Sequence, residues 1–394
     1  MTPVSPLRIL VVAPERHALR QPHPGGLEAA VWNRVRWLRR RGHRVELCAA
    51  AGSDFLDGVP ELQLPTPRWR RESDVSDTDY PEGHRRRMAE AFDRIRVRLE
   101  HAMTRVDVVD NHSLHGAPIL WSHAPGVPVV TTLHTPPLPE MVIAANALPA
   151  SAPHRFLAVS QYTARSWSSE GVDAFVFPNG VDTTQWRLGP GGEDWVWFGR
   201  IVPEKAPHLA ILAARRAGAR IRVAGRIGDE GYFAREVEPL LGADALFVGA
   251  LRQQELCDLV GSAAVALVTP MWSEPFGLVM AEALVTGTPV AAFDSGGASE
   301  VLAGLPGTAV VPAGDVDALA DAASALARSS RRDTVRRRVR EAATDRHSLA
   351  RRHREVERAI SVAAHSSPVP AVLPSAPAAL GLGTVGAAVE AVGA

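Results

Sequence analysis

The sequence predicts an α/β protein built from two parallel-sheet domains. Short apolar, β-branched runs alternate with segments of helical periodicity in both halves of the 394 residues, which is typical of repeated βαβ units. The turn-rich segment Pro-Asn-Gly-Val-Asp at 178–182 interrupts this alternation, which then starts again. We therefore expect domains at 1–178 and 179–344, a further helix at 345–363, and a disordered tail rich in Pro, Ala and Gly at 364–394.

Composition argues against several classes of protein. Lys plus Arg and Asp plus Glu number 43 each, so no overall charge favours nucleic acid, and the Arg-rich segment 331–360 carries acids among its bases. Cys48 and Cys257 have neither zinc-ligand nor disulfide-framework spacing. The first apolar run is too short for a signal peptide and none reaches 18 residues, so we expect a cytoplasmic protein without a transmembrane segment.

The first half begins with a βαβ unit that contains a glycine pair. Residues 8–13 and 45–50 have the composition of buried strands, and the helix between them opens at Gly25-Gly26. Glycine has no Cβ atom, so the N–H groups of this helix start could approach a phosphate closely. The pair is not part of a GxGxxG motif, which argues against a dinucleotide dehydrogenase, and a simple turn stays open as the alternative.

A loop and a basic helix are expected next. Residues 60–83 predict a long surface loop, whose acids between 72 and 79 do not have the spacing of a calcium site. Residues 84–103 combine one apolar face with many arginines. A solvated face is favoured by the acids among these arginines, and peripheral contact with an anionic membrane is the alternative.

Histidines follow two neighbouring strand signals. The strand at 106–109 leads into Asn111 and His112, and the strand at 127–133 leads into His134. Ligands of open parallel sheets bind beyond the carboxyl ends of the strands, so these side chains are expected to line one cleft. The Pro-Pro pair after His134 fixes its loop and favours this histidine for a reactive role. The alternative is a structural role, in which His134 only forms a hydrogen bond at the end of its strand.

The second half supplies cations and carboxylates. Arg200 and Lys205 follow a strand, where the fork of donors on Arg200 and the mobile charge of Lys205 could clamp a diphosphate. The alternative is that both are solvated surface cations. Glu274 and Glu282 flank a Pro-Phe-Gly turn and the start of an apolar helix, whose first N–H groups make an anion site. Two carboxylates beside an anion site suit a nucleotide sugar, whereas a buried helix with a capping acid is the alternative.

The order of these motifs resembles the retaining GT-B glycosyltransferases of family four. The resemblance covers residues 8–362 and rests on Gly25-Gly26, His134, PNGVD, Gly199-Arg200 with Glu204-Lys205, and EPFGLVMAEAL followed by GTPV and GG..E. It implies a hexosyltransferase with two Rossmann-like domains facing each other across a deep cleft. The donor would bind the second domain and the acceptor the first, onto which residues 345–362 would cross back.

The resemblance also implies roles for single residues. Arg200 and Lys205 look like the pair that holds the diphosphate and supports the leaving group. Glu282 looks like the carboxylate that binds the ribose, whereas Glu274 and His134 resemble residues beside the donor sugar. The remaining donor-side positions are Gly26, Gly225, Arg226, Leu251, Phe276, Gly277 and Leu278, and Asn111 and His112 are assigned to the acceptor side.

The implied reaction needs no metal and no cofactor beyond the nucleotide sugar, and it retains the anomeric configuration by front-face attack. UDP-glucose is the first expectation for the donor and GDP-mannose the second. Loops at 15–26, 60–83, 111–116 and 134–146 would meet the acceptor, for which the Pro-rich 134–149 and Trp69 favour a small hydrophobic or aromatic molecule, with a glycan or a lipid-linked acceptor as alternatives.

Three other interpretations stay open. A covalent role for Glu274 is chemically reasonable but less favoured. A sugar-nucleotide epimerase would keep the fold, although we identify no acid/base set for it. A non-catalytic sugar-nucleotide-binding protein is disfavoured because Arg200, Lys205, Glu274, Glu282 and His134 occur together. Nothing in the sequence indicates an oligomeric state.

Overall fold

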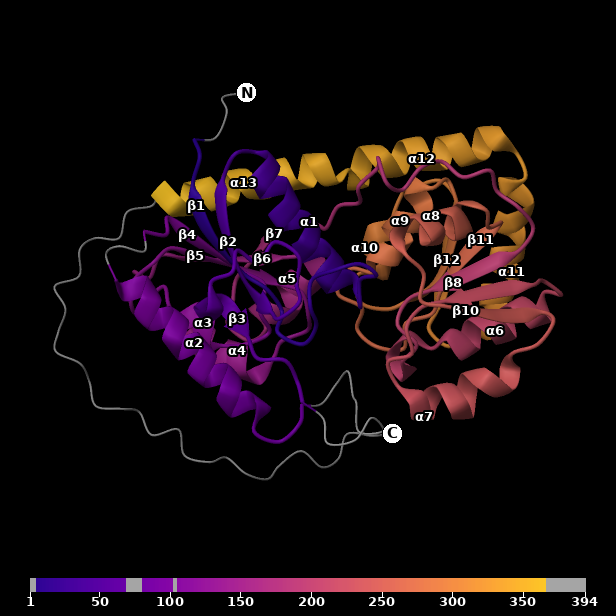
Figure 1. The fold of residues 1–394 in the computed structure, drawn as a ribbon. Coiled ribbons are helices and arrows are strands. Elements are labelled where there is room, and N and C mark those ends of the chain that lie inside the picture. Colours follow the sequence, from indigo (N-terminus) through magenta and orange to yellow (C-terminus); the bar gives the residue numbers. More distant parts are fainter. Residues whose placement is uncertain (1–4, 69–79, 102–104, 366–394) are drawn as a thin grey trace.

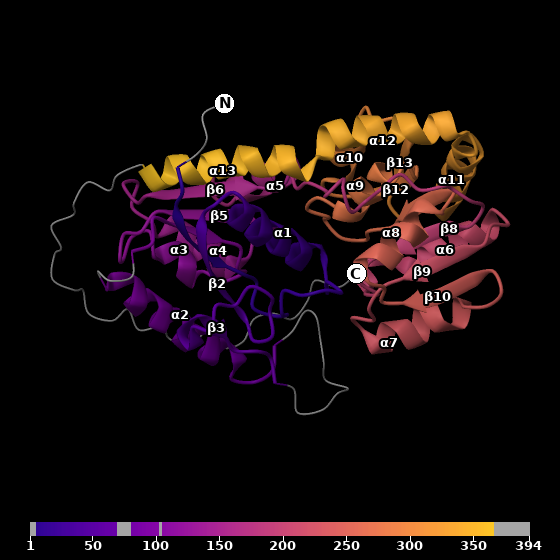
Figure 2. The same cartoon turned by 45° about the horizontal axis from the view of Figure 1, so that its top comes forward.

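The computed structural model describes residues 5–68, 80–101 and 105–365, and it confirms the predicted architecture (Figure 1). Two parallel sheets lie side by side, each covered by helices on both faces, which gives two Rossmann-like α/β domains (Figures 1 and 2). The acids between 72 and 79, Trp69 and the tail from 366 onward lie outside the described residues.

The first domain contains a seven-stranded sheet in the spatial order β3-β2-β1-β4-β5-β6-β7. Its strands are β1 (Arg8–Val12), β2 (Arg44–Ala50), β3 (Gln63–Leu64), β4 (Val108–Asn111), β5 (Val129–Leu133), β6 (His154–Ala158) and β7 (Phe175–Val176). Its helices are α1 (Gly26–Arg40), α2 (His84–Glu100), α3 (Ala117–Leu120), α4 (Pro139–Asn146) and α5 (Gln161–Ser168), with a short 3-10 turn at Pro60–Leu62.

The second domain contains a six-stranded sheet in the order β10-β9-β8-β11-β12-β13. Its strands are β8 (Trp195–Phe198), β9 (Ile221–Ala224), β10 (Ala245–Gly249), β11 (Val265–Val268), β12 (Val290–Asp294) and β13 (Thr308–Pro312). Its helices are α6 (Pro207–Arg216), α7 (Glu230–Tyr232), α8 (Gln253–Gly261), α9 (Leu278–Val285), α10 (Ala298–Leu302), α11 (Val316–Ser330) and α12 (Asp333–His347), and the last helix, α13 (Leu349–His365), follows them in the chain but packs on the first domain. Single 3-10 turns lie at Pro203–Lys205 and Glu238–Leu240, and a π-helical turn at Phe233–Val237.

The central strands are buried on both faces because helices cover each side of the sheet. In β1, Ile9 and Val11 pack into the cluster that includes α1, whereas Leu10 and Val12 pack against the apolar face of α2. Full burial of one such side chain contributes about 1.5–3 kcal/mol. In both sheets the strand order reverses next to the first strand, between β1 and β4 and between β8 and β11. Ligands of doubly wound folds bind at this reversal point, so the fold itself predicts where a site lies.

Two loop predictions are wrong in part. The loop expected at 60–83 begins with structure, because Leu62 and Leu64 are buried and β3 pairs with the edge of β2. A two-residue strand is too short to give a periodic signal. The loop expected at 134–146 contains α4, which begins at Pro139, a residue well suited to a first helical position because it needs no N–H partner there. The sequence also gave no signal for the edge strands β7 and β13.

The chain crosses between the domains twice. It leaves the first domain after β7, and Val181 then pairs with the α12–α13 junction, where Leu349 N donates to the Val181 carbonyl over 2.9 Å. Helix α12 lies on the second domain and α13 on the first, as the yellow helices of Figure 1 show. Val356 and Ile360 enter the first domain's core, and the buried Glu357 accepts a hydrogen bond from Arg41.

The helices of the described residues include none that is long and apolar enough to cross a membrane.

Candidate active site

The loop at 269–277 joins β11 to α9 and carries Glu274. Glu274 is 7% exposed, and its carboxylate pairs with the Lys205 ammonium group and accepts a hydrogen bond from Trp272 Nε1 over 3.0 Å. The Lys205 ammonium group also lies 4.9 Å from the centre of the Trp272 ring. These contacts hold Lys205, which belongs to the loop after β8, against the end of the neighbouring strand β11.

Gly277 sets the geometry at the start of α9. Its φ of 76° is in the left-handed region, and a Cβ atom there would lie 2.3 Å from Met280 Cε. Gly277 is the N-cap residue and provides no side-chain cap for α9, so the first N–H groups of that helix are available to an anion. The Pro-Phe-Gly sequence therefore leads into a helix start without a side-chain cap, and anion binding there stays a prediction.

The two domains meet at the predicted glycine pair. Gly25 is the N-cap of α1, and a Cβ atom placed on it would lie 3.7 Å from Arg200 Cδ. A Cβ atom on Gly26 would lie 3.7 Å from Leu278 Cβ, at the start of α9. Arg200 itself lies 3.5 Å from Glu204 through its Nη2 atom. Glycine backbone of the first domain thus lies against the cation and the helix start of the second.

The loops after β8 and β9 are in tight contact. Gly225 has a φ of 150°, and a Cβ atom there would lie 1.7 Å from the Gly199 carbonyl oxygen. Next to it, Arg226 donates from Nη1 to its neighbour's carbonyl. Leu251, in the loop after β10, is partly buried against the core. These positions lie beyond the carboxyl ends of adjacent strands, where the resemblance expects the nucleotide, and their donor contacts stay a prediction.

Glu282 lies within α9, the helix that follows the loop. Burial raises the pKa of its carboxyl group to about 8. Near neutral pH the group is therefore mostly protonated in the protein without ligand. Glu274, by contrast, is held by a lysine, so the two carboxylates differ in environment despite their proximity in sequence.

Buried polar groups connect the strand ends of the first domain. His112 Nδ1 lies 2.9 Å from His134 Nε2, and His112 Nε2 lies 3.2 Å from Asp110 Oδ1. Arg34, on the buried face of α1, contacts the other Asp110 oxygen at 3.4 Å. We call Arg34, Asp110, His112 and His134 the strand-end network. His112 contacts His134 as the sequence predicts, whereas Asn111 is fully buried and donates to Thr131 Oγ1 over 3.1 Å.

The surroundings of the strand-end network shift the pKa values of His134 and Asp110. Burial, assisted by the charges of His112 and Arg34, lowers the pKa of His134 well below its usual value, so this imidazole is neutral at pH 7. Burial alone would raise the pKa of Asp110, but His112 and Arg34 outweigh it and lower that pKa to about 2. The ionised carboxylate favours a proton on Nε2 of His112, the nitrogen that faces it.

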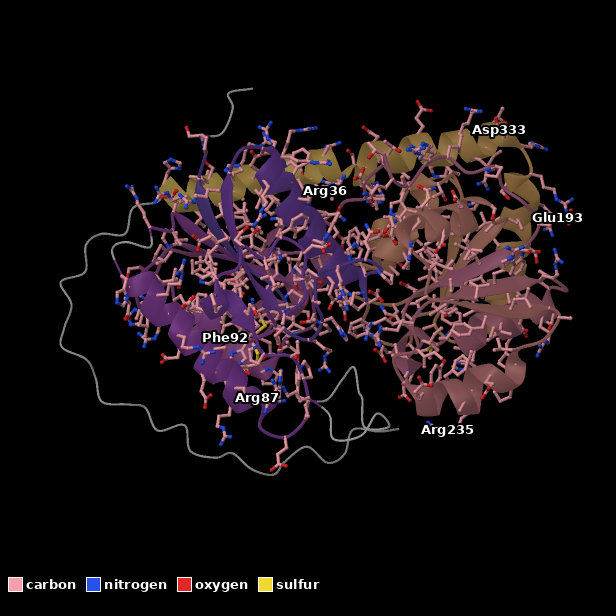
Figure 3. The ribbon with its side chains drawn as sticks, in the orientation of Figure 1. Arg36, Arg87, Phe92, Glu193, Arg235 and Asp333 are labelled. Carbon is pink, nitrogen blue, oxygen red and sulfur yellow. The ribbon has the colours of Figure 1, made fainter. Side chains whose placement is uncertain are left out.

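Arg34 and Asp110 were missed in the sequence. The available signal was a charged residue at each of two positions expected to be buried, one on the apolar face of α1 and one at the end of β4. Arg36 on the same helix was also missed; it contacts Asp182 of the interdomain segment at 3.8 Å, and Figure 3 shows it on the side of the first domain nearest the second.

Two family models match adjoining parts of the chain: Glycosyltransferase Family 4 over residues 24–185 and Glycosyl transferases group 1 over residues 185–346. A D-inositol 3-phosphate glycosyltransferase of Mycobacterium avium is 31% identical over 82% of this chain and 86% of its own length. The chain belongs to glycosyltransferase family 4. It is a hexosyltransferase that takes its sugar from a nucleotide-sugar donor.

Further relatives and solved structures agree with this assignment. The phosphatidyl-myo-inositol mannosyltransferase of Mycolicibacterium smegmatis is 28% identical over 76% of this chain and 80% of its own. AviGT4, a glycosyltransferase involved in avilamycin A biosynthesis, superposes with a TM-score of 0.63 at 23% identity over 92% of this chain and 99% of its own. Anabaena HepE, solved with UDP-glucose, gives a TM-score of 0.68 at 18% identity, over 90% of this chain and 100% of its own, and these two structures establish the GT-B fold.

Proposed function

We propose that this glycosyltransferase transfers a hexose to an acceptor hydroxyl with retention of the anomeric configuration and without a metal. The observation that carries the proposal is that Arg200 and the uncapped start of α9 lie against the glycine pair of the first domain, while Glu274 of the loop before α9 holds Lys205. This arrangement concentrates positive charge where a diphosphate would leave. We call residues 269–277 the donor loop.

The chemical step follows from that charge. The bond between the anomeric carbon and the β-phosphate oxygen breaks, and its electron pair goes to the phosphate. Arg200, Lys205 and the N–H groups of α9 stabilise the charge that develops there, in a site already organised for it. The acceptor hydroxyl then attacks the oxocarbenium-like carbon from the same face, and its proton passes to the departing phosphate oxygen.

The environments of Glu274 and His134 support this scheme over the covalent alternative. The Lys205 ion pair neutralises Glu274 and reduces its strength as a nucleophile, whereas it leaves the carboxylate able to accept hydrogen bonds from sugar hydroxyls. His134 is neutral, so it does not act as a cationic acid at pH 7. A neutral imidazole can accept or donate one hydrogen bond to the donor sugar, which fits a positioning role.

We propose two candidate donors, UDP-glucose and GDP-mannose. The sequence alone favours UDP-glucose, with GDP-mannose next, but relatives that are mannosyltransferases by name raise the weight of GDP-mannose. The names of these relatives and of the inositol phosphate glycosyltransferases suggest inositol derivatives as acceptors to test. They add to the small hydrophobic or aromatic acceptors expected from the sequence. A cytoplasmic location stays a prediction from the sequence.

The test is a panel of nucleoside diphosphate sugars incubated with and without acceptors. A product that keeps the donor's anomeric configuration by NMR supports retention, whereas the inverted product overturns it. Conversion of the donor without any acceptor would favour the epimerase, and tight donor binding without turnover would favour the non-catalytic protein. Among the described residues there is no group of three or more His, Cys, Asp or Glu that could hold a metal ion. Metal independence predicts that EDTA leaves kcat unchanged.

A further inference from the structure

One stretch of the second domain has no part in the proposed chemistry, namely Gly296-Gly297 and Glu300 at the start of α10. Both glycines lie against the donor loop. A Cβ atom on Gly296 would lie 2.2 Å from the Glu274 carbonyl oxygen, and one on Gly297 would lie 2.6 Å from the Pro275 carbonyl oxygen. Gly297 N donates to the Glu274 carbonyl over 2.7 Å, so this glycine backbone supports the loop from behind.

Glu300 extends from the same element into the first domain. Its two carboxylate oxygens accept hydrogen bonds from the backbone N–H groups of Gln161, over 2.9 Å, and Tyr162, over 3.2 Å. These are N–H groups of the first turn of α5, which have no partner within their own helix. A carboxylate at this position is also favoured by the helix dipole, and its hydrogen bonds are charge-assisted. The second domain therefore caps a helix of the first.

The first domain contacts the donor loop at the same place. Ser160, the N-cap of α5, accepts from Thr163 N and donates from its hydroxyl to the Pro275 carbonyl over 2.6 Å. Thr163 Oγ1 donates to the same carbonyl over 3.3 Å. Figures 1 and 2 both place α5 and α10 side by side where the domains meet. The donor loop is thus held by α10 on one side and by α5 on the other.

We propose that Glu300, Ser160 and Thr163 are positioning residues that set the donor loop only when the domains are closed. None of them needs to touch the donor. Closure delivers the Ser160 and Thr163 hydroxyls to the Pro275 carbonyl, and Glu300 keeps α5 in place to do so. Because Pro275 follows Glu274 directly, movement of this carbonyl displaces the Glu274–Lys205 pair. The expected effect on kcat rests on the proposed function, whereas the expected effect on the order of the donor loop does not depend on it.

The first test is Glu300→Gln, which keeps the side chain's size but removes its charge and turns one acceptor into a donor. We expect kcat to fall about tenfold, as the loss of charge-assisted hydrogen bonds implies. Affinity for UDP or GDP alone, measured by calorimetry, should stay within about twofold, because the nucleotide would bind the second domain. Asp315→Asn is the matched control, since Asp315 caps α11 inside one domain by accepting from Ala318 N over 2.9 Å. It should leave kcat unchanged.

Hydrogen exchange provides a measurement that does not depend on turnover. In Glu300→Gln, amides of 160–165 and of the donor loop should exchange about tenfold faster than in the wild type, and in Asp315→Asn they should not. Thr163→Val should accelerate exchange in the donor loop to a smaller degree. An active wild type whose Glu300→Gln variant keeps full kcat and unaltered exchange at 269–277 overturns the inference. A wild type that turns over no donor overturns the proposed function instead, and the exchange data then decide the positioning role.

Discussion

The donor loop and the strand-end network are both polar and both lie at the ends of parallel strands, but they are built differently. The donor loop uses backbone: Gly277 turns the chain, Gly296 and Gly297 pack beneath it, and the first N–H groups of α9 are left for a ligand. The strand-end network uses buried side chains, in which Arg34, Asp110 and two histidines compensate one another.

The difference determines what each region can do. Backbone N–H groups and exposed cations are free to change partners when a ligand arrives. A buried network is already paired, and removing one member leaves the others desolvated without a partner. We therefore expect removal of the donor-site cations to affect catalysis more than stability, and variants of the strand-end network to lose stability first. Four experiments test this contrast.

The largest effect is expected from the cations. Arg200→Ala or Lys205→Ala removes stabilisation of the leaving phosphate, and kcat should fall about 10²–10³-fold, as for loss of a group that acts on developing charge. Arg200→Ala should change thermal stability little, because that side chain is partly exposed, whereas Lys205→Ala also removes the charge partner of the buried Glu274 and should lower thermal stability. Arg216→Ala is the control, an exposed cation of the same domain paired with Asp317, and it should keep full kcat. Near-normal kcat in both site variants would remove the proposed leaving-group role.

The next effect concerns the buried carboxylate. Asp110→Asn should lower the free energy of unfolding by about 3 kcal/mol, because Arg34 and His112 lose their counter-charge inside the protein. Asp244→Asn breaks an exposed pair with Arg215 and should leave the free energy of unfolding nearly unchanged, because solvent screens that pair. The pKa of Asp110 is lowered to about 2 in the folded protein, so its stabilising contribution is present above the usual carboxyl range and is lost as pH falls towards 2. Equal urea midpoints for the two variants would contradict this prediction.

A smaller effect is expected from the turn of the donor loop. Gly277→Ala places a side chain at a φ of 76° and against Met280, whereas Gly42→Ala meets the same kind of φ, 87°, with no atom within 4 Å. The backbone strain alone costs about 1–2 kcal/mol in each. We expect both variants to lose this much stability, measured by denaturant unfolding, and only Gly277→Ala to weaken donor binding as well. Unchanged donor affinity in Gly277→Ala would show that the turn does not shape the site.

The smallest effect is a pH dependence. If donor ribose is bound by ionised Glu282, whose pKa burial raises to about 8, donor affinity should rise up to about tenfold per pH unit below 8 and level off above it. Glu282→Gln should weaken binding and remove this dependence. The raised pKa also means that the folded protein holds a proton that the unfolded chain releases, so this group makes the wild type less stable as pH rises towards 8. Glu282→Gln should therefore be the more stable protein at pH 9, as thermal unfolding can measure.

This contrast also explains how much could be predicted from the sequence. The donor loop was predictable because glycine, proline and carboxylate at fixed spacing each constrain the backbone locally, and the same holds for Gly25-Gly26 at the start of α1. The pairing of Arg34 with Asp110 was not predictable, since 76 residues separate them and only the packing of α1 on the sheet brings them together. The contact of Glu300 with α5 depends on how two domains meet, and edge strands such as β3 are too short to produce a pattern.

The last helix, α13, has a consequence for how the protein is made. Val356, Ile360 and Ala363 belong to the same apolar cluster as Ile9 and Val11, although the whole second domain separates them along the chain. During synthesis the first domain is complete in sequence long before these residues emerge from the ribosome. The part of this apolar cluster that α13 covers therefore stays exposed while the second domain is translated, although α1 already packs on the same cluster. The N-terminal half is the first to be synthesised and the last to be finished.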